Sequence, residues 1–151
     1  MKIVLLHYHL NRGGVTQVIA NHLLGLNACV PNGEQMQVAL LYGGRSEGWP
    51  KNLACELDRL DVSLRVASEL DYDNVRPRRK NLTLQLRETL DQAGFKPRET
   101  ILHVHNHSLG KNTALPNALW ELVCAGSELL TWEDRNSWAE GGFLIAGKDV
   151  T

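Results

Sequence analysis

Short apolar runs alternate along this chain with segments in which apolar residues recur at helical spacing. Five runs are apolar enough, or alternate regularly enough, to form strands: residues 2–7, 36–42, 62–66, 99–105 and 128–132. Amphipathic helices are expected between them, over residues 15–26, 49–60, 77–93 and 115–123. Continuously apolar strands are typical of a parallel sheet that is covered on both faces, because every side chain is then buried.

This alternation predicts an α/β fold, because a helix is the usual connection between two parallel strands. We expect one doubly wound, Rossmann-like domain over residues 1–134, with helices on both faces of the sheet. The sheet should be mostly parallel and have about five or more strands. Residues 135–151 do not continue the pattern, and their glycines and polar residues predict an irregular C-terminal tail.

The composition favours a water-soluble protein and argues against two classes of partner. The 151 residues are 43% hydrophobic, enough for one core, and the net charge of −1 gives no basic field for nucleic acid. No stretch approaches the roughly 20 apolar residues of a transmembrane segment. The three cysteines show no CxxC spacing, which favours reduced, partly buried thiols. We therefore expect a cytoplasmic protein with no nucleic acid partner and no transmembrane segment.

A glycine loop, "NRGGVTQV", joins the first predicted strand to the first predicted helix. In an open α/β sheet such a turn lies at the carboxyl edge of the strands, where the helix offers free N–H groups to an anion. Gly13 and Gly14 would let a phosphate approach the backbone closely, and Thr16 could add a hydroxyl. The loop matches neither GxGxxG nor Walker A, so an ordinary turn is the alternative interpretation.

Histidines follow two of the predicted strands in pairs, as His7 and His9 and as His103, His105 and His107. Alternate residues of a regular strand share a face about 6.7 Å apart, so the outer two of the three would be about 13 Å apart. One metal ion could not bind all three, and no metal site is predicted. If the first and fourth strands are neighbours, His9, His105 and His107 meet beside the glycine loop. There they could bind sugar hydroxyls or phosphates, or move protons. The alternative for His7 and His103 is a structural role in the core.

These two motifs give the chain a resemblance to a known family. The residues that carry it are "MKIVLLHYHLNRGGVTQVIANHLLGL" and "TILHVHNHSLGKNTALPNALWELVCAG". They resemble the N-terminal half of a GT-B glycosyltransferase, and they are most similar to the large family 4 group of retaining enzymes. That half shows a strand, a GG loop and a helix, and later a strand that ends in His-x-His before a small apolar helix. The match covers roughly residues 1–130 of this chain.

The resemblance implies a transferase that moves a sugar from a nucleotide sugar to an acceptor hydroxyl, such as that of a sugar or glycolipid. Its N-terminal domain would bind the acceptor and close over the donor. On this chain the loop residues Gly13, Gly14, Val15 and Thr16 would lie beside the donor diphosphate. The acceptor side of the cleft would be lined by His9, His105, Asn106 and His107. No catalytic residue is assigned, and no cofactor is predicted.

The chain departs from the family pattern in two places. Family members commonly have a histidine at the end of the fifth strand, where this sequence reads Trp132, Glu133 and Asp134. The second domain, which carries most nucleotide contacts in the family, is not among the 151 residues. The sequence therefore predicts a truncated transferase domain that is inactive alone, with a separate donor-domain protein or a second copy of the chain as partner.

Two other functions remain open at this point. One is a non-catalytic module that binds a sugar or a partner protein. The other is a metal-dependent hydrolase that would use His7, His9, His105 and His107.

Overall fold

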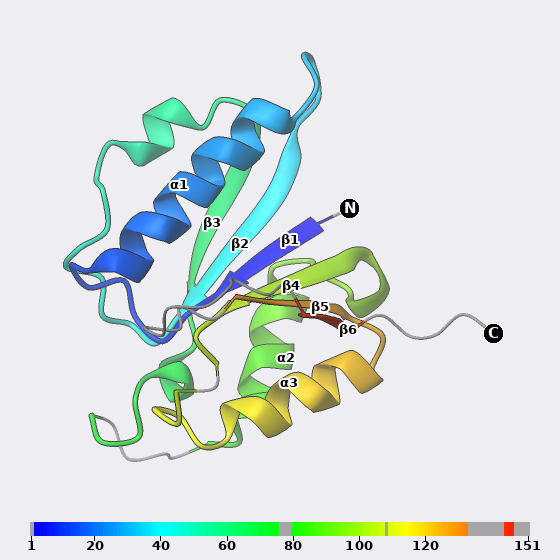
Figure 1. Ribbon diagram of the computed structural model, residues 1–151. Helices are drawn as coiled ribbons and strands as arrows, with labels where there is room; N and C mark the ends of the chain where they lie inside the picture. Colours follow the sequence, from blue (N-terminus) through cyan, green and yellow to red (C-terminus); the bar gives the residue numbers. More distant parts are fainter. Residues whose placement is uncertain (1, 76–79, 108, 133–143, 147–151) are drawn as a thin grey trace.

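A six-stranded sheet in the order β3-β2-β1-β4-β5-β6 organises the fold (Figure 1). The computed structural model describes residues 2–75, 80–107, 109–132 and 144–146. The strands β1 to β5 are parallel and comprise Lys2–Leu6, Met36–Tyr42, Leu60–Val66, Thr100–His105 and Glu128–Trp132. The sixth strand, β6 (Leu144–Ala146), pairs antiparallel with β5 at the edge of the sheet and is not among the strands that the sequence predicted.

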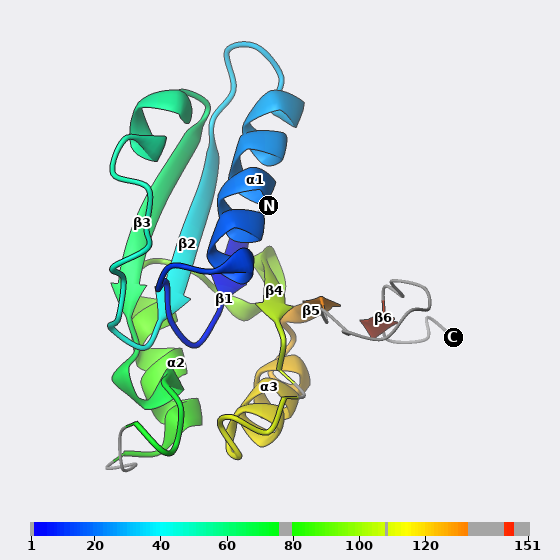
Figure 2. The ribbon, with the colours of Figure 1, turned by 60° about the vertical axis from the view of Figure 1, so that its left-hand side comes forward.

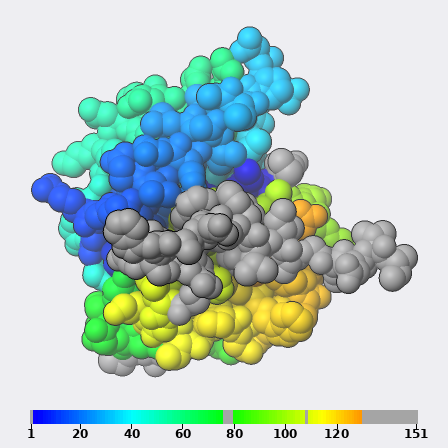
Figure 3. Space-filling model, viewed as in Figure 1, coloured from blue at the N-terminus to red at the C-terminus, as the bar shows by residue number. Residues whose placement is uncertain are grey.

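Three helices cover the two faces of this sheet. One face carries α1 (Gly14–Cys29), and the other carries α2 (Leu82–Gln92) and α3 (Leu115–Cys124) (Figures 1 and 2). In the space-filling view, α1 forms the upper part of the visible surface and α3 the lower part (Figure 3). The prediction of a Rossmann-like α/β fold with helices on both faces is therefore confirmed.

The two faces of β1 bury different halves of the core. Ile3 and Leu5 pack with residues of α1, whereas Val4 and Leu6 pack with residues of α2 and α3. This division follows from the alternation of side chains along a strand. In β4, Leu102 and Val104 belong to the core under α2 and α3. The intervening side chains of β4 therefore face α1, and two of them are histidines.

The helix ends follow local sequence signals. The side chain of Asn81 caps α2 by accepting a hydrogen bond from the N–H of Leu84 at 3.0 Å. Pro116 lies in the first turn of α3, where a missing N–H leaves no bond unmade. Gly94 and Gly126 follow α2 and α3 with φ angles of 77° and 105°, which favour glycine over residues with a Cβ. These signals explain why the stripes of apolar residues in the sequence become helices of limited length.

The predicted helix over residues 49–60 is wrong for most of its length. Only Leu53–Glu56 form a single 3-10 turn, η1, and Leu60 is already the first residue of β3. Leu53 and Leu57 are buried as their spacing indicates. Leu60, however, pairs with Met36 in the sheet and therefore belongs to β3, not to a helix. Two more 3-10 turns, η2 (Ser68–Leu70) and η3 (Pro97–Glu99), complete the described elements.

The three cysteines differ from the expectation of partly buried thiols. Cys29, Cys55 and Cys124 are free and exposed.

Among the described residues, no helix has both the length and the apolar character needed to cross a membrane.

Candidate functional site

The chain segments that follow β1 and β4 meet at the carboxyl edge of the sheet. The two strands are parallel neighbours, with Leu6 opposite Val104. The hydroxyl of Tyr8 donates a hydrogen bond to the carbonyl oxygen of Asn106 at 2.9 Å, and Nδ1 of His7 lies 3.3 Å from the carbonyl oxygen of His105. Strand order reverses between β1 and β4, and such reversals are where open α/β sheets bind ligands.

The glycine loop leads directly into α1 at this edge. Gly13 precedes the helix in an extended conformation, φ 167°, and no side chain caps the helix. A Cβ added at Gly13 or Gly14 would have no atom of the described residues within 4 Å, so the space in front of these glycines is open within that part of the chain. The first turn also contains no acidic residue. The N-terminus of α1 therefore presents backbone N–H groups and the positive end of the helix dipole to a space that none of the described residues fills.

Thr16 takes part in the loop itself. Its side chain is buried, and its hydroxyl donates a 2.6 Å hydrogen bond to the carbonyl oxygen of Asn11. The hydroxyl thus ties the start of α1 to the preceding segment. An anion at the helix N-terminus would be bound by backbone N–H groups, with no help from this proton.

A partly buried ion pair lies at the base of the loop. Arg45 donates two hydrogen bonds to the carboxylate of Asp71, at 2.8 and 2.5 Å, and the carbonyl oxygen of Arg45 accepts from the N–H of Leu10 at 2.7 Å. The N–H of Gly48 donates to the carbonyl oxygen of Leu10 at 3.0 Å. The bond to Asp71 raises the pKa of the Arg45 guanidinium. Residues 10–12 are therefore held from the opposite side of the loop by residues 45–48.

His9 lies beside this ion pair with a defined tautomer. The N–H of Asn11 donates to Nδ1 of His9 at 3.3 Å, so Nδ1 carries no proton. Nε2 must then hold the proton of the neutral ring and donate it to the hydroxyl oxygen of Tyr72, 3.2 Å away. Burial, and next the charge of Arg45, lower the pKa of His9. His9 is therefore neutral at pH 7.

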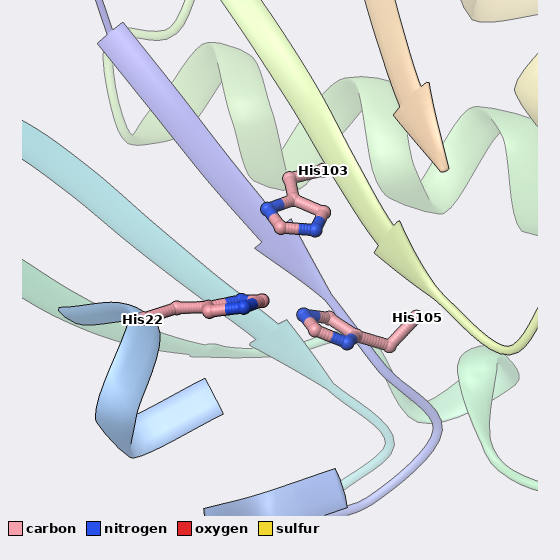
Figure 4. Close-up of side chains that lie close together, drawn as sticks. All are labelled: His22, His103 and His105. Carbon is pink, nitrogen blue, oxygen red and sulfur yellow. The ribbon is translucent and has the colours of Figure 1, made fainter. Parts of the chain in front are cut away.

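Three other histidines converge between the sheet and α1. His103 and His105 lie on the face of β4 that is covered by α1, and His22 reaches them from that helix (Figure 4). One ring nitrogen from each lies within 4.8 Å of the others. The rings of His103 and His105 stack with centroids 4.6 Å apart, and the ring of His7 is 6.3 Å from that of His105. His7 and these three residues form what we call the imidazole cluster.

Burial keeps the imidazole cluster uncharged. It lowers the pKa of His7 to about 4, that of His103 to about 4 and that of His105 to about 2. For His105, repulsion from His103, His22 and His7 in their charged forms adds to the effect of burial. Burial also lowers the pKa of His22. A proton on one ring would lie in a poorly solvated place next to other imidazoles, so all four residues stay neutral at pH 7.

The third histidine of the run, His107, lies beyond the strand. β4 ends at His105, and Asn106 has a φ angle of 57°, so the regular alternation of faces stops there. The carbonyl oxygen of His107 accepts a hydrogen bond from the hydroxyl of Tyr8 at 3.3 Å. The structure thus places Asn106 and His107 at the contact between the two loops, and places His105 under α1.

The residue that sequence reasoning missed is His22. It lies within the predicted helix over residues 15–26, at a position that shares the spacing of the apolar residues of that helix. The signal in the sequence was a histidine among the apolar residues of a helix. To which residues this histidine lies close depends on the strand that the helix covers, and the sequence alone does not show that.

We compared the chain with protein-family models, curated protein sequences and solved structures, and found no match. These comparisons assign no family, so the likeness to GT-B glycosyltransferases rests on the two quoted motifs.

Proposed function

We propose that this domain is the acceptor-side domain of a glycosyltransferase that uses a nucleoside diphosphate sugar. The observation that carries this proposal is the N-terminus of α1, which no side chain caps and no described residue covers, at the edge of the sheet where β1 and β4 both end. Backbone N–H groups at such a terminus bind phosphate groups. The fold class and the two motifs on which the resemblance rests support the same reading.

The proposed chemistry assigns a separate role to each loop. The bond between the donor sugar and its diphosphate breaks, the acceptor oxygen bonds to the sugar carbon in its place, and the hydroxyl proton passes to the leaving diphosphate. The N–H groups of Gly14 and Val15 and the dipole of α1 stabilise the negative charge that grows on the diphosphate. The acceptor lies on the side of His9 and His107. His9 is less buried than His105, which is only 1% exposed and covered by α1. We therefore assign contacts with the acceptor to His9 and His107, and a supporting position to His105.

The first prediction concerns diphosphate binding by the glycine loop. On titrating the ¹⁵N-labelled chain with UDP, GDP and their sugars at pH 7, we expect saturating amide shifts at Gly13, Gly14 and Val15. The dissociation constant should be on the order of 1 mM, corresponding to about −4 kcal/mol, because the resemblance assigns most nucleotide contacts to a second domain. Nuclear magnetic resonance measures the affinity and locates the site in one experiment.

Alanine variants separate binding from folding. Gly13→Ala and Gly14→Ala add a Cβ to open space, so the fold should persist. They should weaken diphosphate binding about tenfold, because the added methyl keeps a phosphate away from the backbone. Gly25→Ala is the matched control, since this glycine also lies in α1 and has no atom within 4 Å of an added Cβ.

Two results would contradict the proposal. One is an absence of shifts in the glycine loop at ten times the expected dissociation constant. The other is equal binding by Gly14→Ala and the Gly25→Ala control. Shifts caused by a free sugar but not by a diphosphate would instead favour a sugar-binding module without transferase chemistry.

A further inference from the structure

We propose that His22, His103 and His105 together bind one divalent transition-metal ion, of which Zn²⁺ is the natural candidate. Two ligands come from alternate positions on β4 and the third from the helix that covers them (Figure 4). This set shares only His105 with the histidines that the transferase proposal uses. The inference is therefore independent of that proposal.

The distances suit a single ion after a small adjustment. The three candidate nitrogens lie within 4.8 Å of one another. Around a tetrahedral zinc with Zn–N bonds of 2.0–2.1 Å, two ligand nitrogens are about 3.3 Å apart. Each ring must therefore move inward by about 1 Å, which small rotations of side-chain torsions provide. The sequence argued against a metal site because His103 and His107 would be too far apart to bind one ion. With His22 as the third ligand, His107 is not needed.

The buried ring nitrogens of His103 and His105 support a metal site. The side chain of His105 is 1% exposed, and neither ring nitrogen has a hydrogen-bond partner among the residues that the structure describes. Nε2 of His103 also lacks a partner within that part of the chain. A buried polar atom without a partner is costly, and most such atoms in folded proteins are bonded. A metal ion would accept a lone pair from each of these rings.

The ligand types select the metal. Three neutral imidazoles suit Zn²⁺, Co²⁺, Ni²⁺ and Cu²⁺, whereas Ca²⁺ and Mg²⁺ require oxygen ligands. Three protein ligands also leave one coordination position open for water or an anion. His105 has no carboxylate or carbonyl partner among the described residues to orient its ring. Such partners raise affinity 10- to 100-fold, so we expect a dissociation constant on the order of 1 μM.

The test uses the full chain without a polyhistidine tag, stripped with EDTA and dialysed. Titration calorimetry with ZnCl₂ should give one site per chain, and addition of Co²⁺ should give the visible absorption bands of a tetrahedral ion. His22→Gln should weaken zinc binding by about 100-fold, since one of the three ligands is lost. This variant lies on α1 and is only partly buried, so it should fold even where a change at His105 prevents folding.

His9→Gln is the matched control. It removes an imidazole at the same edge of the sheet that is not part of the candidate group, so it should bind zinc as the unaltered chain does. The absence of a stoichiometric zinc site would overturn the proposal. Equal zinc affinity of folded His22→Gln and the unaltered chain would also overturn it. Circular dichroism of the metal-free variants shows whether each one is folded.

Discussion

Lowering the pH from 7 to 5 is expected to reduce the free energy of unfolding by about 6 kcal/mol. Burial lowers the pKa of His7 and of His103 to about 4 and that of His105 to about 2 in the folded chain. In the unfolded chain all three have a pKa of about 6.5, so below that pH the unfolded state binds protons that the folded state does not. Stability is therefore complete above about pH 6.5 and is lost as the pH falls toward 4. Each imidazole accounts for about 2 kcal/mol of the stability lost between pH 7 and pH 5.

Urea unfolding at pH 7, 6 and 5, with EDTA present to exclude metal ions, measures this loss. His105→Leu removes one of these three titrating groups, so the loss between pH 7 and 5 should fall by about a third. Equal unfolding free energies at pH 7 and 5 for the unaltered chain would show that the imidazoles take up protons in the folded state. The burial argument would then be wrong.

Gly48→Ala is expected to destabilise the fold by about 3 kcal/mol and to weaken diphosphate binding as well. A Cβ at this position would overlap the backbone of Asn11 and Arg12, and no side-chain rotation relieves contacts with backbone atoms. The N–H of Gly48 also donates to the carbonyl oxygen of Leu10. The substitution would push residues 10–12 away from their position, and these residues lead directly into Gly13.

Gly25→Ala again provides the control, because the same substitution there meets no atom within 4 Å. It lies inside α1 and should stabilise the chain by about 0.5–1 kcal/mol, since alanine favours a helix more than glycine does. Thermal unfolding of both variants checks the opposite signs. A melting temperature for Gly48→Ala equal to that of the unaltered chain would mean that the loop adjusts without cost.

Individual elements show where sequence reasoning succeeded and where it failed. The run "MQVALLY" predicts a strand over residues 36–42, and β2 has the same limits, because residues 38–42 are continuously apolar and buried and two glycines follow them. The spacing of Leu53 and Leu57 correctly indicates burial, but the segment is too short for periodicity to separate a helix from a turn. The segment ends where Leu60 pairs with Met36 and begins β3.

The candidate site was likewise predicted only in part. The sequence placed the glycine loop and the His-x-His run at the carboxyl ends of two strands, because continuous apolar runs locate those strands. It did not show that β4 turns His103 and His105 toward α1, or that His22 meets them there.

The sequence by itself determined the five parallel strands, the helices α1, α2 and α3, the α/β class and the position of the glycine loop. Local periodicity and turn residues carry this information, and both act between near neighbours in the chain. Only the tertiary structure decided which histidines share a space. That outcome depends on the helix that packs over each face and on the left-handed backbone of Asn106 after β4. Residues 22 and 105 are far apart in the chain, and only packing of α1 on the sheet brings their rings to a centroid distance of 5.3 Å.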